Sequence, residues 1–340
     1  MNRKYFISSL VTAGAAISTT PVWAASENTV PRAHKTPPYL QPGDTIGITS
    51  PAGYISLAEI QPAVQLMESW GFKVLIGPTI GKKDYTYGGT DDERTADLQA
   101  MLDNPDVKAI MCARGGYGLV RIIDKIDFKR FKKHPKWVIG FSDITVLHCH
   151  INRHYGIATL HSKMCNSFPD VWEKAEPIQI STILSIKQAL LGEEMKYQSP
   201  AASLNRTGKA EGVLVGGNLS MIATLSGTTS ELDTKGKILF VEDTGEYLYN
   251  IDRMLWNLKR SGKLDKLAGL IVGGFKVKPD EPGEEFGKTV PEIVMEKVQE
   301  YGYPVCFDFP VGHQRANFAF KCGAKHVLEV GEDDSMLRAV

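Results

Sequence analysis

The sequence predicts an α/β protein in which an N-terminal doubly wound parallel-sheet domain is followed by a second, C-terminal α/β domain. Short apolar runs typical of buried strands alternate with segments whose apolar residues recur at helical spacing. A chain of 340 residues, 43% of them hydrophobic, can bury a large core and has the length of two domains. The alternation weakens around 185–210, which favours a boundary there.

In the first half, strands and helices alternate in order. An apolar run at 45–52 predicts the first strand, and the helix expected at 57–71 ends at Gly71. The helix expected at 91–105 opens with acidic residues, which the helix dipole favours. The same reasoning predicts strands at 72–78, 107–113 and 136–141 and helices at 118–126 and 143–156. We place the N-terminal domain at 40–185.

The second half repeats the alternation after an interruption. The segment 186–209 is expected to be a linker, and 210–335 the C-terminal domain. Within this domain the pattern predicts strands at 237–243, 267–275 and 304–309 and helices at 250–262 and 290–302.

The N-terminus has the features of a secretory signal peptide over residues 1–25. Arg3 and Lys4 precede a short apolar segment, and Val22 and Ala24 form a small-x-small cleavage site. We therefore expect an exported, periplasmic protein cleaved near Ala24. No run reaches the roughly 18 apolar residues that a transmembrane helix needs, so no integral membrane segment is expected after signal removal.

Charge excludes one class of partner. Lys plus Arg equals Asp plus Glu at 39 each, so there is no basic excess to bind nucleic acid. Recognition is expected to come from a local site.

No metal and no organic cofactor is expected. The five cysteines are widely spaced without a CxxC pair, and we interpret them as mostly buried thiols. His148, His150 and His154 are close in sequence, but Ile151 stands where an HExxH motif has its glutamate.

The run "ARGGYGLVR" (113–121) leaves three interpretations open. It could be a phosphate-binding turn, although Arg121 stands where GxGxxG needs its third glycine. It could be a tight turn that needs positive φ angles. It could also expose backbone N–H groups, including that of Gly116, to an oxyanion.

Ser142 follows an expected strand and precedes an expected helix, which is the outline of a nucleophile elbow. In that geometry the N–H of Asp143 would face a developing oxyanion. The alternative is that Ser142 or Asp143 is an ordinary helix N-cap. Ile144 occupies the last glycine of G-x-S-x-G, which argues against a standard α/β-hydrolase.

Two further positions could carry chemistry. Glu242 ends an expected strand, where parallel sheets present functional residues, and His313 follows an apolar run in a loop. An acid at a strand end is also often part of a solvated rim, and a lone loop histidine often has no catalytic role.

Eight segments in register resemble the LD-carboxypeptidase family of serine peptidases over roughly residues 40–330. They are "PGDTIGITSPAG", "GGTDDERTADLQAML", "ARGGYG", "IGFSDIT", "VGGNLSMI", "VEDTGEYLYNIDRML", "LAGLIVGGF" and "VGH". The resemblance implies a parallel-sheet domain that carries the serine and a C-terminal domain that supplies Glu and His across an interdomain cleft. It also implies a homodimer.

Carried over by residue, the resemblance implies Ser142 as nucleophile, Glu242 as the acid and His313 as the general base. It places the oxyanion amides on Gly116 and Asp143. Because this donor is a backbone amide, we expect Asp143→Ala to be milder than loss of Ser142. Arg114 is a candidate, by charge alone, for the substrate carboxylate.

Two departures from the family pattern stand out. Phe141 replaces a more frequent tyrosine, and "LHSKM" (160–164) stands where many members have Gly-Pro-Met. Lys163 in the second segment could alter the pocket.

The expected function is that of an exported serine L,D-carboxypeptidase, which removes terminal D-alanine from peptidoglycan stem tetrapeptides through an acyl-enzyme. One alternative is a related peptidase that cleaves peptidyl-nucleotide or acyl-amino-acid conjugates. A second is a periplasmic binding protein without catalysis, which would leave the three carried-over residues without a shared purpose.

Overall fold

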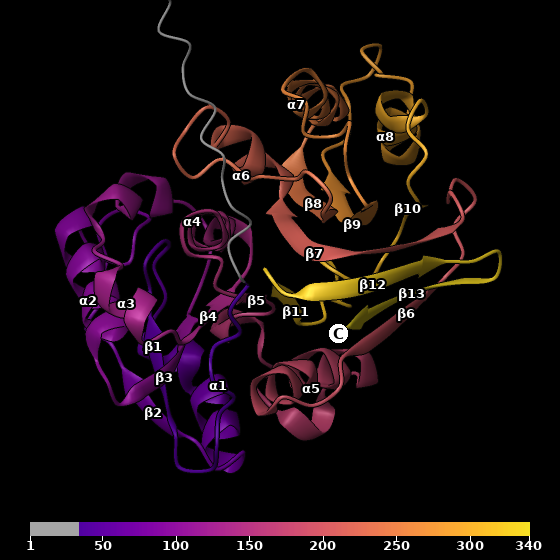
Figure 1. Cartoon of the computed structure of the whole chain (residues 1–340). Helices are drawn as coiled ribbons and strands as arrows, with labels where there is room; N and C mark the ends of the chain where they lie inside the picture. Colours follow the sequence, from indigo (N-terminus) through magenta and orange to yellow (C-terminus); the bar gives the residue numbers. More distant parts are fainter. Residues whose placement is uncertain (1–33) are drawn as a thin grey trace, which may run out of the picture. The chain divides into compact units, whose positions relative to one another are not determined.

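The computed structural model describes residues 34–340 (Figure 1). The expected signal peptide lies outside this range. Within it, no helix is long and apolar enough to cross a membrane.

The first sheet has six strands in the order β11-β5-β4-β3-β1-β2. Strands β1 to β5 are parallel to their neighbours, and β11, from the C-terminal end of the chain, pairs antiparallel with β5. The strands are β1 (Thr45–Thr49), β2 (Lys73–Ile76), β3 (Val107–Cys112), β4 (Trp137–Gly140), β5 (Thr159–His161) and β11 (Phe320–Cys322). The expected doubly wound parallel sheet is confirmed, with one antiparallel edge strand.

Helices cover both faces of this sheet. Alternate strand residues face two separate apolar clusters, one containing side chains of α1 and α5 and the other those of α2 and α4. The helices are α1 (Leu57–Ser69), α2 (Asp91–Asp103), α3 (Lys129–Lys133), α4 (Thr145–Tyr155) and α5 (Pro177–Leu191). Ser56 and Thr90 begin α1 and α2 with complete capping boxes, which explains why these two helices start where the sequence predicted.

The helix expected at 118–126 is wrong. The structure has two short 3₁₀ turns there, Leu119–Arg121 and Ile123–Lys125. The segment begins at Gly118, whose φ of 148° is not helical, and it is rich in β-branched residues that disfavour a helix.

The second sheet is mixed and has seven strands in the order β10-β9-β8-β7-β12-β13-β6. β7 to β10 are parallel, whereas β12, β13 and β6 extend the sheet in antiparallel fashion. The strands are β6 (Lys196–Pro200), β7 (Gly208–Asn218), β8 (Ile238–Glu246), β9 (Gly269–Val277), β10 (Val305–Cys306), β12 (Lys325–Val330) and β13 (Asp334–Ala339). The segment expected to be a linker, 186–209, contains the end of α5 and all of β6, which belongs to this sheet.

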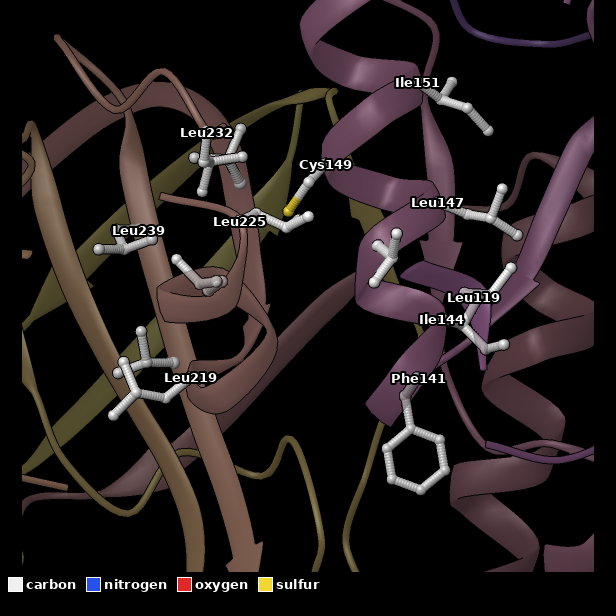
Figure 2. Packing of buried hydrophobic residues seen from close by; sticks show 14 of the residues in the cluster. Leu119, Phe141, Ile144, Leu147, Cys149, Ile151, Leu219, Leu225, Leu232 and Leu239 are labelled. Carbon is white, nitrogen blue, oxygen red and sulfur yellow. The ribbon is translucent and has the colours of Figure 1, made fainter. Parts of the chain in front are cut away.

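Three helices, α6 (Leu219–Thr224), α7 (Leu248–Arg260) and α8 (Val290–Val298), cover one face of the parallel part of this sheet. The apolar cluster beneath them continues without a break into the cluster around α4. Figure 2 shows Leu147 and Ile151 on α4 pointing away from Leu219 and Leu239, with Cys149 on the α4 surface that faces them. All five cysteines are buried and unpaired, as the sequence predicted.

Candidate active site

Ser142 lies on a sharp turn at the carboxyl end of β4. Its backbone is left-handed, with φ of 63°, and a 3₁₀ turn over Ser142–Ile144 leads directly into α4. Such a conformation costs a non-glycine residue about 1–2 kcal/mol. A Cβ at Gly140 would lie 2.8 Å from Cγ1 of Ile144, so the turn needs a glycine there. This is the strand–turn–helix geometry of a nucleophile elbow, not that of an N-cap residue.

The glycine loop after β3 lies against this turn. A Cβ at Gly115 would come within 3.3 Å of the Ser142 hydroxyl, so a side chain there would crowd it. The carbonyl of Gly115 accepts a hydrogen bond of 2.9 Å from the N–H of Gly53. Because the peptide is trans, the N–H of Gly116 points the opposite way, away from Gly53. Gly116 has a φ of 101°, which fits both the tight turn and the amide donor expected from the sequence.

The side chain of Asp143 anchors the same loop. It is 1% exposed, and its Oδ2 accepts the N–H of Leu119 at 2.9 Å. From the other side, Arg94 Nη1 donates to the carbonyl of Gly118 at 3.1 Å. Burial raises the pKa of the Asp143 carboxyl to about 6. The sequence interpretation considered the Asp143 amide and missed this carboxylate, whose partner lies 24 residues away.

Glu242 and His313 form a buried pair at the carboxyl end of β8. Nδ1 of His313 contacts Oε2 of Glu242 at 2.5 Å, and the backbone N–H of His313 donates to the same oxygen at 3.2 Å. The Glu242 side chain is 0% exposed and that of His313 is 16% exposed. Burial raises the pKa of Glu242, and the hydrogen bond from His313 opposes that rise. The carboxylate therefore orients the imidazole and leaves Nε2 free to act on a substrate.

Gly312 and Asn317 set the position of the His313 loop. Gly312 has a φ of 101°, and a Cβ there would overlap that of Glu242. Its N–H donates to Oδ1 of Asn317 at 2.8 Å. His161, at the end of β5, is buried nearby, and burial lowers its pKa well below the usual value. The sequence gave no signal for Asn317, since a single asparagine in a loop is unremarkable by pattern.

The pair and the serine turn meet through Phe141. Its ring lies 4.9 Å from that of His313, centroid to centroid. The chain after His313 reaches β11, which pairs with β5 beside β4. His313 is thus held against both sheets, next to the residue that precedes Ser142. The three residues singled out in the sequence converge at one edge.

A polar chain links the same elements behind the site. The hydroxyl of Thr145, in the first turn of α4, accepts the N–H of Asn218 at 3.0 Å. Asn218 Nδ2 donates to Asp243 at 2.9 Å, next to Glu242. Asn218 also caps α6 by accepting from the N–H of Met221. This network fixes the start of α4 relative to the end of β8.

The remaining sequence candidates lie elsewhere or have other partners. Arg114 donates through Nη1 to the carbonyl of Tyr54 at 3.2 Å. In α4, Nε2 of His148 pairs with the carbonyl of Gly140 at 2.9 Å, and Nδ1 of His150 pairs with Ser230 at 2.8 Å. A cavity of about 560 Å³ lies at the opposite, amino-terminal ends of β3 and β4 and touches none of the site residues.

We expect Asp143→Asn to change how stability depends on pH. The folded protein binds the Asp143 proton more tightly than the unfolded chain, where an aspartate has a pKa of about 3.9. Wild type should therefore lose stability relative to the variant as pH rises from about 4 to about 6, by up to about 3 kcal/mol, and the difference should then level off. Urea unfolding of both proteins from pH 4 to 8 measures this. Parallel stability curves would contradict it.

Comparisons with known proteins agree with this geometry. The family model for the LD-carboxypeptidase N-terminal domain matches residues 46–162, and that for the C-terminal domain matches 211–328. A probable murein peptide carboxypeptidase of Bacillus subtilis is 36% identical over 305 residues, which cover 89% of this chain and 94% of that protein.

Solved structures give the same result. The muramoyltetrapeptide carboxypeptidase of Oxalobacter formigenes superposes with a TM-score of 0.77 at 28% identity, covering 87% of this chain and 98% of that one. The microcin C7 self immunity protein MccF shares the fold, with a TM-score of 0.77 at 23% identity and coverage of 89% and 98%. With both family domains matched in order, the chain belongs to the LD-carboxypeptidase family of serine peptidases.

Proposed function

We propose that this protein is an exported L,D-carboxypeptidase that removes the terminal D-alanine from peptidoglycan stem tetrapeptides. The observation that carries the proposal is the buried Glu242–His313 pair, placed against the strained turn of Ser142. The relatives named as murein peptide and muramoyltetrapeptide carboxypeptidases support the substrate class.

The proposed reaction needs only side chains and amides of this chain. Ser142 attacks the scissile carbonyl, and Nε2 of His313 takes the hydroxyl proton because Nδ1 faces Glu242. The buried carboxylate of Glu242 stabilises the imidazolium that forms. The amides of Gly116 and Asp143 would bind the oxyanion. His313 then protonates the leaving D-alanine, and water hydrolyses the acyl-enzyme.

Cleavage of amino-acid–nucleotide conjugates is the second candidate. One MccF structure holds aspartyl sulfamoyl adenosine, but at 23% identity the likeness supports the fold alone. A binding protein without catalysis ranks lower. It would have no use for a strained serine beside an oriented histidine, and strain of this kind clusters at functional sites.

We expect Ser142→Ala and His313→Ala each to reduce turnover by about 10⁴-fold, because each removes one part of a concerted unit. Glu242→Gln should also be severe, since it keeps the shape but removes the anion. The measurement is release of D-alanine from a tetrapeptide by the purified mature protein, with circular dichroism as the folding control. Near-normal turnover by Ser142→Ala would sink the nucleophile assignment.

Substrate stereochemistry gives a second test. The two epimers of a terminal alanine exchange the directions of methyl and hydrogen once carbonyl and carboxylate are fixed, so one site does not fit both. A mismatch that leaves buried polar groups unpaired can cost about 10⁴-fold in rate. We expect a tetrapeptide ending in D-alanine to be trimmed to the tripeptide. The L-alanine epimer and the pentapeptide ending in D-Ala-D-Ala should remain largely intact by mass spectrometry. Equal cleavage of both epimers would indicate a general serine carboxypeptidase.

Export makes a prediction about the mature chain. Cleavage near Ala24 should leave a protein that begins at about Ala25. Intact-mass measurement on protein from the native cell envelope tests this, and a cytosolic species that retains Met1 would refute it. Light scattering of the same preparation tests the homodimer that forms part of the proposal.

A further inference from the structure

A carboxypeptidase has to recognise the free carboxylate of the residue that leaves. Three covalent bonds separate the attacked carbonyl carbon from that carboxylate carbon, so the two stay within about 4 Å of each other. The recognising cation must therefore lie close to both the nucleophile and the general base. A partly buried cation is the stronger candidate, because water screens an exposed one.

Lys163 lies at this position. It follows β5, and its Nζ donates to the carbonyl of Gln314 at 2.8 Å. The same Nζ lies 5.8 Å from the centroid of the Phe141 ring. Gln314 directly follows His313, and Phe141 directly precedes Ser142. The ammonium group thus contacts the neighbours of both proposed catalytic residues.

The ammonium of Lys163 has unused bonding capacity. An ammonium group carries three donors, and the contact with Gln314 uses one of them. Lys163 is half-buried, and none of the ion pairs formed among residues 34–340 includes it. A half-buried cation without a carboxylate partner is costly unless something else supplies the anion.

The charges around Lys163 favour an added anion. Burial, and then the charge of Lys276 on β9, lower the pKa of Lys163 to about 8, whereas Glu242 acts in the opposite direction. Glu242 is itself committed to His313. The neighbouring His161 is held neutral by its own burial. Two lysines therefore face this position, and the acid nearest to them is already paired.

Arg114 fits the requirement less well. Its guanidinium donates to the carbonyl of Tyr54, and its charge acts on Glu59 at the start of α1. The residue is also exposed. Arg114 therefore has both a hydrogen-bond acceptor and a nearby acid.

We propose that Lys163, which departs from the common family sequence, binds the free C-terminal carboxylate of the substrate and determines the preference for a substrate acid. Lys276 adds positive charge from the second sheet. The inference rests on the proposed carboxypeptidase activity and assigns the carboxylate subsite within it.

The test compares a tetrapeptide ending in D-alanine with its C-terminal amide. For Lys163→Met, the KM for the acid should rise by about 10- to 100-fold with a small change in kcat, since a hydrogen bond to a charged group is lost. The KM for the amide should change little. Lys163→Arg should restore part of the preference for the acid. Arg114→Met, which removes a cation from the other side of Ser142, should retain that preference.

The pH dependence adds a readout that a purely structural role would not give. In wild type, the KM for the acid should rise as pH passes about 8 and Lys163 loses its proton. This rise should be absent in Lys163→Met and for the amide substrate.

Several outcomes would overturn the inference. An equal loss of kcat on acid and amide would make Lys163 only a tether for the His313 loop. A selective effect of Arg114→Met would assign the subsite to Arg114. Should wild type cleave neither peptide, the proposed function fails. Calorimetric titration of Ser142→Ala with both peptides then decides the inference by itself, and equal or absent binding of acid and amide would refute it.

Discussion

The close approach of the end of β7 to the first turn of α4 is the constraint on which the arrangement of this site depends. A Cβ at Gly217 would lie 2.5 Å from the hydroxyl oxygen of Thr145, so only a glycine allows the contact. The next residue, Asn218, donates its N–H to that hydroxyl. Because α4 directly follows Ser142 and β7 lies beside β8, this contact sets the position of Ser142 relative to Glu242.

The energy that maintains this contact comes from the core around α4. All residues from Thr145 to Ile151 are buried, and the apolar cluster around them contains side chains from both sheets and from α6 and α7. A helix that is buried on all sides cannot shift without opening cavities, which cost up to a few kcal/mol for each large side chain removed. The strained φ of Ser142 is therefore maintained by packing that lies mostly outside the site.

Burial also sets the electrostatics of the site. Glu242 and Asp143 are both removed from water, and burial raises the pKa of each. Their partners keep them useful. Glu242 orients the imidazole of His313, and Asp143 holds the loop that carries Gly116. Polar groups fixed in this way need no reorganisation as charge develops during a reaction, which is the main source of electrostatic catalysis.

The sequence alone predicted the elements whose signals are local. The helix starts at Ser56 and Thr90, the buried strands and the turn at Ser142 each depend on residues close together in the chain. The eight family segments further identified Ser142, Glu242 and His313, because a motif in register carries its functional positions with it. The short 3₁₀ segment after Gly118 was mistaken for a helix, since apolar spacing does not distinguish the two over so few residues.

Only the tertiary structure decided which groups meet across long separations. The pairing of β11 with β5, the bond from Asp143 to Leu119 and the contact of Lys163 with Gln314 join residues between 24 and roughly 160 positions apart. Such contacts leave no periodic trace in a sequence, because each depends on how two separately formed elements pack together. The sequence therefore determined the chemical groups of the site, and packing determined which of them became partners.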